Sequence, residues 1–211
     1  MITINEKPTL LGLDNVAADG AEAFDTIEGV LQELGRNDTV APDTIVQLKD
    51  DLKHGKRYLK GQYKLDCENI ESNVPDHCHL YALSDPKVPE YQSVCNHHHD
   101  SRCPDCERLK DTLKSVEEVV RSCEVDEKSK SVMLYDITQA REKIEQWKGH
   151  ILAVIHQEKQ KHDVMQQMNE ETAFIIIDFA MKYLPKRYRE DMASWFGKTG
   201  LIFVMIFWYY G

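Results

Sequence analysis

Apolar side chains recur every three or four residues over 17–35, which places them on one face of an α-helix. Gly35 is well placed to end this helix. Its apolar positions are Ala21, Phe24, Ile27, Val30, Leu31 and Leu34. A second helix is predicted from Pro42 or Asp43 to about Tyr63, weakened in its second half by Gly55 and Gly61. Its apolar face consists of Ile45, Leu48, Leu52 and Leu59. We expect residues 1–63 to form a helical region.

The helical spacing stops between residues 64 and 106, a stretch rich in proline. The prolines are Pro75, Pro86, Pro89 and Pro104. They predict irregular structure, but an irregular loop of this length is unusual in a compact domain. Metal ligation can order such a segment in place of a hydrophobic core, so residues 64–106 are predicted to be a zinc-binding segment.

Regular spacing returns at Glu107, with apolar residues alternating three and four positions apart as in a coiled-coil seam. The first run is Leu109, Leu113, Val116, Val120 and Cys123. After a charged turn near 124–130 the second run is Met133, Ile137, Ala140, Ile144, Trp147, Ile151 and Val154. Two such helices with a short connection predict an antiparallel helical hairpin over 107–169, reaching about Asn169 or breaking near Glu158.

Two short apolar runs, 172–177 and 201–210, are rich in β-branched and aromatic residues and predict neighbouring strands. We expect residues 170–211 to contain one or two strands of an incomplete α/β domain. The second run is about half of the roughly 20 residues that a membrane-spanning helix needs, so no membrane span is expected. Without the rest of a sheet, residues 201–210 are expected to favour self-association.

The chain carries 36 acidic and 26 basic residues, a formal net charge of −10. This charge argues against a broad surface for duplex DNA and leaves room only for a local basic patch. Residues 1–25 lack the basic start and apolar run of a secretory signal, so a nuclear or cytoplasmic, intracellular location is expected. There, the six cysteines favour metal ligation or free thiols over disulfides.

Thiols and imidazoles gather between residues 77 and 106. The predicted metal ligands are Cys78, Cys95, His97, His99, Cys103 and Cys106. Cys103 and Cys106 form a Cys-x-x-Cys pair that a tight turn can bring to one Zn²⁺. Cys95 pairs with His97 or His99, and His77 is an alternative to Cys78. The potential ligands exceed the four that one zinc needs, so either some are bystanders or two ions bind. A closed Cys/His set predicts a structural zinc.

Asp178 ends the apolar run at 172–177. Metal-dependent phosphoryl-transfer enzymes place carboxylate ligands for two Mg²⁺ ions at such strand ends, and one Asp cannot do this alone. The same position suits the cap of a helix over 179–184, and position alone favours the cap.

Two basic patches are candidates for contacts with nucleic acid, although most such runs are solvated faces. The first consists of Lys53, His54, Lys56, Arg57 and Lys60. The second consists of Lys182, Lys186, Arg187 and Arg189, among aromatic residues.

Short motifs follow one another in a distinctive order. They are Asp76-His-Cys-x-x-Tyr81-Ala-Leu-Ser-Asp-Pro86, Cys95-x-His97-x-His99, Cys103-x-x-Cys106, Trp147-Lys-x-His150, Ile177-Asp-Phe-Ala-Met-Lys182-x-Leu-Pro and Trp195-Phe-Gly-Lys-x-Gly200. Over roughly residues 10–200 this order resembles a group of uncharacterised, transposon-derived proteins of invertebrates. They are similar to DDE-type transposases, with a zinc-binding segment and helices before a ribonuclease H-like catalytic domain.

The resemblance implies that Asp178 matches the first acidic residue of the catalytic triad. It also implies that the six predicted ligands form the metal segment, with Cys67 and Cys123 outside it. The pattern should continue after Gly200 into strands that carry a second Asp and a final Glu, but no acidic residue follows Asp191. Mg²⁺ is therefore expected only if an intact catalytic domain were restored.

These observations predict a mainly α protein, a catalytically incomplete remnant of a transposase-like protein with a structural zinc site and no enzymatic activity of its own. The first alternative is a zinc-dependent interaction module that binds DNA or a protein partner through the zinc segment. The second is a nuclease or transposase completed by another chain. The third is a protein tethered to a membrane by residues 201–210.

Overall fold

The computed structural model describes residues 13–36, 40–85, 87–89, 92, 94–169, 173–179 and 204–210. The chain divides into two compact units, one of residues 13–159 and one of residues 1–12 with 160–211. The helix predicted to follow Asp178 and the second basic patch (Lys182, Lys186, Arg187 and Arg189) lie outside the described residues.

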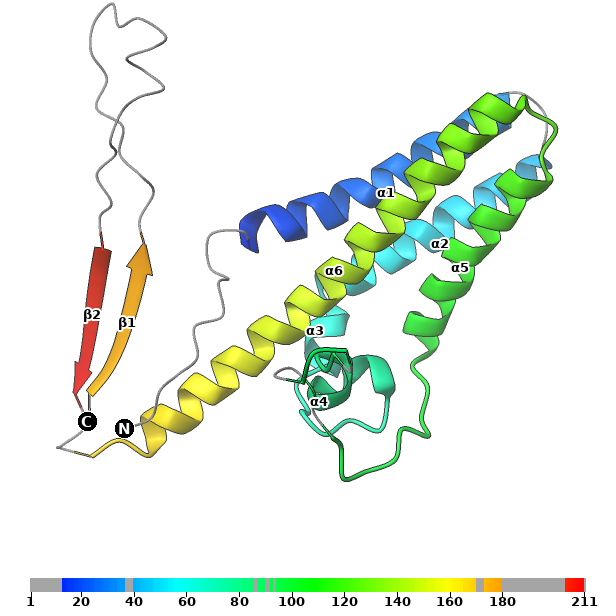
Figure 1. The fold of residues 1–211 in the computed structure, drawn as a ribbon. Helices are drawn as coiled ribbons and strands as arrows, with labels where there is room; N and C mark the ends of the chain where they lie inside the picture. Colours follow the sequence, from blue (N-terminus) through cyan, green and yellow to red (C-terminus); the bar gives the residue numbers. More distant parts are fainter. Residues whose placement is uncertain are drawn as a thin grey trace, which may run out of the picture. The chain divides into compact units, whose positions relative to one another are not determined.

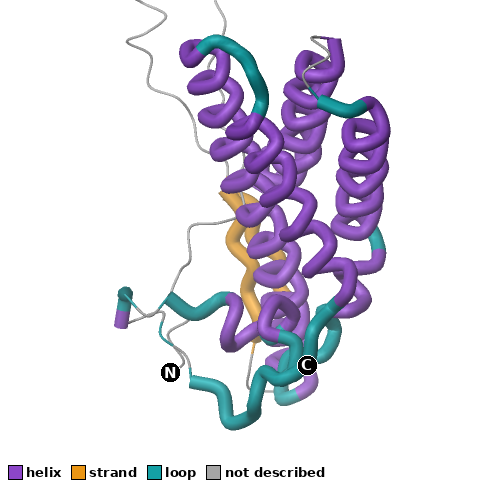
Figure 2. The backbone as a smooth tube through the Cα atoms, turned by 90° about the vertical axis from the view of Figure 1, so that its right-hand side faces the viewer, coloured by secondary structure: helices purple, strands orange, loops and turns teal. Residues whose placement is uncertain are grey.

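The described part of the protein is mainly helical, as predicted (Figure 1). The long helices are α1 (Leu13–Arg36), α2 (Pro42–Lys60), α5 (Pro104–Ser122) and α6 (Glu127–Gln166). Three short elements lie between α2 and α5: α3 (Gln62–Asp66), the 3-10 helix η1 (Pro75–His77) and α4 (His79–Ala82). Figure 2 shows the long helices side by side, with the loops of the 67–103 region at one end. None of the described helices is long and apolar enough to cross a membrane.

The apolar faces predicted for the first two helices form much of the core. In α1, Phe24, Ile27, Leu31 and Leu34 are at most 1% exposed. In α2, the predicted face is likewise buried. Pro42 begins α2, because an N-terminal turn needs no amide donor from its first residue. The helix predicted to reach Tyr63 ends instead at Lys60, and the chain restarts as α3 after Gly61.

The predicted helices at 107–169 are present, and the chain reverses direction between them (Figure 1). Asp126 caps α6, since its carboxylate accepts the Ser129 amide at 3.0 Å. The closest backbone neighbour of α5 is α2, which also lies close to α1. An ion pair of 3.7 Å joins Glu117 of α5 to Arg141 of α6. The reversal of direction between α5 and α6 is thus observed, whereas their close packing against each other as a hairpin stays a prediction.

The buried face of α6 follows the predicted seam as far as Trp147 and then departs from it. Leu152 is buried, whereas the predicted Ile151 and Val154 are half-buried. A straight helix has 3.6 residues per turn, so a 3.5-residue seam drifts around it. Trp147 packs edge-on against Phe24 of α1, with ring centroids 6.4 Å apart, and this contact joins α6 to the core.

The second unit contains two strands, β1 (Ala173–Phe179) and β2 (Val204–Tyr210), which pair antiparallel. Ala173 lies opposite Tyr210 and Asp178 opposite Met205. That this strand pair belongs to an incomplete α/β domain stays a prediction.

Candidate metal centres

The cysteine- and histidine-rich segment is shaped by short backbone turns. Pro75 opens η1, and the amides of His77 and Cys78 both donate to the Val74 carbonyl at 3.0 Å. At its far end the chain returns alongside, with the Ser101 amide donating to the Asn73 carbonyl at 3.2 Å. These bonds bring the two ends of the segment together, although nearly 30 residues separate them in sequence.

Cys103 and Cys106 lie at the start of α5. Cys103 is the extended residue that precedes the helix, Pro104 begins the helix, and Cys106 lies in its first turn. The unpaired amides and dipole of a helix N-terminus stabilise negative charge there. The Cys-x-x-Cys turn thus places two potential sulfur ligands at the start of one helix, where a metal-bound thiolate pair would be stabilised.

Four side chains form a first candidate metal centre, since their ligand atoms all lie within 4.8 Å of one another. They are Cys78, Cys95, His97 and His99. The two sulfur atoms are 3.6 Å apart. Two thiolates on a tetrahedral zinc, with Zn–S bonds of about 2.3 Å, are separated by about 3.8 Å. The sulfur spacing of this centre therefore fits a shared tetrahedral ion.

The imidazoles of the first centre fit a metal as well. His97 Nε2 lies 3.1 Å from the Ser72 carbonyl oxygen, which leaves Nδ1 for an ion. This is the outer hydrogen bond that metal-binding histidines usually make. His99 Nε2 is buried without a hydrogen-bond partner. A buried ring nitrogen is costly to leave unpaired, and a metal ion beside Cys78 and Cys95 would satisfy it.

A second candidate metal centre consists of His77, Cys103 and Cys106, whose ligand atoms also lie within 4.8 Å of one another. His77 Nε2 is 3.3 Å from Cys106 Sγ, and all three residues are buried. Burial lowers the pKa of His77 and raises the pKa of Cys106. Without a cation the thiol therefore stays protonated and the imidazole neutral, so ligation here would release protons.

The Tyr58 hydroxyl lies against all three groups of the second centre. Its oxygen is 3.2 Å from His77 Nε2, 3.2 Å from Cys103 Sγ and 3.7 Å from Cys106 Sγ. It donates to Asp66 Oδ2 at 2.9 Å. Burial, together with hydrogen bonding to Cys103, raises the pKa of Tyr58, so the phenol remains protonated.

Lys148 of α6 brings a positive charge to the second centre. Its ammonium lies 3.0 Å from Asp76 Oδ2 and 3.4 Å from Glu145 Oε2, and the side chain is 11% exposed. Burial alone would lower the pKa of Lys148, but the two carboxylates outweigh burial and raise it. Its charge in turn favours the thiolate of Cys106.

The structure divides the six predicted ligands between two centres. Four of them form the first centre, while Cys103 and Cys106 join His77, which sequence reasoning left as an alternative to Cys78. His77 and Cys78 thus belong to different groups of potential ligands. Their adjacency in the sequence was the signal that could have separated the two groups. His79 lies in neither group of potential ligands. Its Nε2 is 2.6 Å from the Cys67 carbonyl oxygen.

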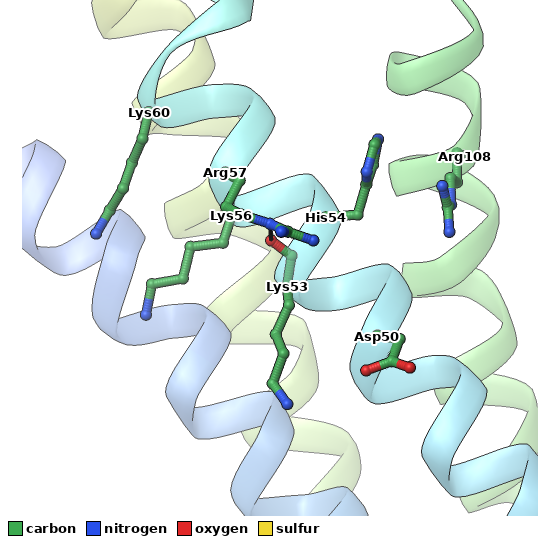
Figure 3. Close-up of a pocket in the computed structure, with 7 residues that line it drawn as sticks. All are labelled: Asp50, Lys53, His54, Lys56, Arg57, Lys60 and Arg108. Atoms are coloured by element: carbon green, nitrogen blue, oxygen red, sulfur yellow. Dashed lines mark hydrogen bonds between the residues drawn. The ribbon is translucent and has the colours of Figure 1, made fainter.

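The first basic patch lies on α2 and, with Asp50 and Arg108, lines an open hollow of about 670 Å³ (Figure 3). Three of its basic side chains have acidic partners: Lys56 contacts Asp25, His54 contacts Asp105, and Arg108 contacts Asp51. Among the described residues, no ion pair involves Lys53, Arg57 or Lys60. The hollow therefore has uncompensated positive charge suited to an anion.

No protein-family model, curated protein or solved structure matches the chain. The likeness to transposon-derived proteins thus rests on the order of the sequence motifs.

Proposed function

We propose that this protein is a zinc-stapled helical module related to transposase-like proteins, of whose catalytic carboxylates residues 1–211 supply only the candidate Asp178. The observation that carries the proposal is the first metal centre, in which two thiols and two imidazoles converge on one point. A closed set of four such ligands leaves no open position for substrate, so the ion is structural.

Zinc is the ion that best matches this donor set. Two thiolates and two neutral imidazoles suit a borderline-soft cation with tetrahedral preference, and they balance its double charge. Magnesium and calcium prefer oxygen ligands, which the first centre lacks among its four members.

The ion would order the segment between α3 and α5. Cys78 follows η1, whereas Cys95, His97 and His99 lie in a stretch without helix or strand among its described residues. Few apolar side chains of this stretch reach the core; Val94, for example, is 80% exposed. Ligation supplies the cohesion that burial does not.

No catalytic role is proposed for Asp178 alone. Two-metal phosphoryl transfer needs several carboxylates around the ions, and Asp178 lies in β1 opposite the apolar Met205. Only the resemblance to transposases matches Asp178 to an acidic residue of the catalytic triad. Binding of catalytic Mg²⁺ would require the other acidic residues of that triad as well.

The proposal is tested by the metal content of the purified protein and of two cysteine variants. Cys78→Ser should lose zinc from the first centre, since it removes one thiolate of four ligands. Cys123→Ser is the matched control, because Cys123 is equally buried but donates to the Val120 carbonyl and lies in neither centre. Wild-type protein that binds no zinc when refolded with it would refute the proposal.

The basic hollow favours a second candidate function, an interaction module for nucleic acid. Lys53, Arg57 and Lys60 lie on one helix without acidic partners among the described residues, and Figure 3 shows their side chains around the hollow. Phosphate contacts of this kind make binding strongly dependent on salt. The net charge of −10 confines such binding to this face.

We expect the Lys53→Glu, Arg57→Glu double variant to abolish retention on a DNA or RNA column. Each lost phosphate contact should reduce the slope of log affinity against log salt by about 0.9 for duplex DNA. Lys143→Glu, a single exposed change on α6, is the control for charge in general. Equal retention of all three proteins would exclude the hollow as a nucleic-acid site.

A further inference from the structure

The second candidate centre has three ligand atoms, one fewer than a closed tetrahedral zinc site takes. A fourth donor has to lie near all three of them. The Tyr58 hydroxyl oxygen does so. It is 3.2 Å from His77 Nε2, 3.2 Å from Cys103 Sγ and 3.7 Å from Cys106 Sγ. The hydroxyl therefore lies within reach of an ion that the three ligand atoms share.

Hydrogen bonds alone do not account for the crowding around this hydroxyl. A phenol has one proton to donate and two lone pairs with which to accept. Tyr58 donates its proton to Asp66 Oδ2 at 2.9 Å. The imidazole nitrogen and the two sulfur atoms then face two lone pairs, so at least one of these three atoms approaches the oxygen without a hydrogen bond.

An ion among the four atoms accounts for the same distances as the edges of a tetrahedron. With Zn–S bonds of about 2.3 Å and Zn–N or Zn–O bonds of about 2.0–2.1 Å, the edges are about 3.3 Å from oxygen to nitrogen and about 3.5 Å from sulfur to either. The observed oxygen-to-nitrogen distance is 3.2 Å, and the oxygen-to-sulfur distances are 3.2 and 3.7 Å. His77 Nε2 is 3.3 Å from Cys106 Sγ. All four observed distances thus lie within about 0.3 Å of the tetrahedral edges.

The hydroxyl can bind an ion without giving up its hydrogen bond to Asp66. Asp66 Oδ2 accepts the phenol proton, and Oδ1 accepts from the Gln62 side-chain amide at 2.7 Å, which holds the carboxylate in place. Donation to a carboxylate increases the negative charge on the phenol oxygen and makes it a better ligand for a cation. The two thiolates then balance the double charge of zinc, and Asp66 remains an outer hydrogen-bonding partner.

Aromatic packing holds Tyr58 in this position. Its ring packs edge-on against Tyr63, with centroids 5.7 Å apart, and Tyr63 packs edge-on against His77 at 5.5 Å. Tyr58 itself is buried on the core face of α2. An ion bound by Tyr58 would therefore connect the core helix α2 to η1 and to the start of α5.

We propose that the Tyr58 hydroxyl oxygen, His77, Cys103 and Cys106 bind a second zinc ion, so that the protein holds two. Four protein donors leave no position for a substrate, so this ion is structural as well. The inference rests on the proposed zinc-stapled function and extends it from one ion to two.

The first part of the test compares the zinc content of two tyrosine variants of the full chain. Tyr58→Phe removes the fourth donor. Tyr63→Phe is the matched control, because it removes a neighbouring buried hydroxyl that donates to the Asp76 carbonyl oxygen. We expect two zinc ions in wild-type protein and in Tyr63→Phe. In competition with a chelator, Tyr58→Phe should hold its second ion at least about 10-fold more weakly.

Cobalt substitution distinguishes a ligand from an outer hydrogen-bonding group. A closed centre has no position for an added anion, whereas loss of the Tyr58 oxygen leaves a position that azide can fill. Azide should therefore shift the visible absorption of cobalt in Tyr58→Phe but not in wild-type protein or in Tyr63→Phe. Equal responses of wild-type protein and Tyr58→Phe, whether present or absent, would overturn the assignment of Tyr58.

If Tyr58→Phe fails to fold, the wild-type protein provides the test by itself. Azide should leave its cobalt absorption unchanged, and a shift would overturn the assignment of Tyr58. One zinc ion in wild-type protein, lost in Cys78→Ser, would overturn the second site and leave the proposed function standing. No zinc at all would overturn both.

Discussion

At the scale of single residues, two glycines allow helices to approach closely. A Cβ atom at Gly20 of α1 would lie 2.6 Å from Trp147 Cβ, which is near the backbone of α6 and cannot easily move. At Gly55 of α2 the nearest atom would be Leu109 Cδ1 at 2.7 Å, the end of a flexible side chain. Gly55 weakens α2 by helix propensity alone, but its lack of a side chain leaves room for Leu109 of α5 to pack against α2.

We expect Gly20→Ala to destabilise the protein by about 1–3 kcal/mol, because overpacking outweighs the better helix propensity of alanine. Gly29→Ala on the same helix has open space around the new methyl group and should stabilise it by about 0.5–1 kcal/mol. Urea unfolding of both variants measures the difference. Similar effects of the two substitutions would contradict the close approach of Trp147.

A second residue-scale prediction concerns the charge of Lys148. Because its pKa in the folded protein is raised, its stabilising effect is complete below the pKa of an unfolded lysine and is lost as the pH rises through the folded pKa. Lys148→Met should cost about 1–3 kcal/mol at pH 8, since it leaves Asp76 without its cation.

The deficit of Lys148→Met should shrink as the pH rises above the ordinary lysine value of 10.5. Urea unfolding from pH 8 to 11 in the presence of zinc provides the measurement. Lys143→Met, an exposed lysine on the same helix, should show no such trend. A deficit that stays constant over this range would mean that Lys148 acts through packing rather than charge.

At the scale of elements, we expect the segment between α3 and α5 to depend on metal ligation more than on its helices. Its regular elements are as short as three and four residues, η1 and α4. Such pieces are not stable alone, because helix nucleation is unfavourable. The long helices have an extensive apolar face and need no ion.

Cys103→Ser or Cys106→Ser should therefore remove the second ion and unfold residues 64–106 while α1 and α2 stay folded. Hydrogen exchange read by mass spectrometry should show fast exchange confined to that segment. Cys123→Ser, outside both centres, should exchange like the wild type. Protection of residues 64–106 that persists in both ligand variants, with zinc content unchanged, would show that the metal does not hold the segment together.

At the scale of the whole molecule, the sequence predicted where helices form better than it predicted which helices pack against each other. The faces of the first two helices were predicted correctly, since three- and four-residue spacing follows directly from helical geometry. That α5 lies closest to α2 depends on contacts distant in sequence, which no local pattern encodes. That the strand pair at 173–179 and 204–210 belongs to an incomplete α/β domain stays a prediction.

The ligand residue types were likewise visible in the sequence, whereas their grouping was not. Spacing places Cys95, His97 and His99 together, but it cannot show that Cys78 joins them while its neighbour His77 joins Cys103. That division depends on η1, whose turn directs adjacent side chains to different sides. The interruption at Gly61, which separates α2 from α3, was visible in the sequence only as a weak point in one long helix.

The adjacency of His77 and Cys78 has a consequence for how the ions are taken up. Neighbouring Cα atoms are about 3.8 Å apart across a rigid peptide unit, so fixing one ligand also fixes the direction of the next. Filling one centre would then lower the entropic cost of filling the other, and loading would be cooperative. Titration with limiting zinc would yield mainly empty and doubly loaded chains, with few that hold a single ion.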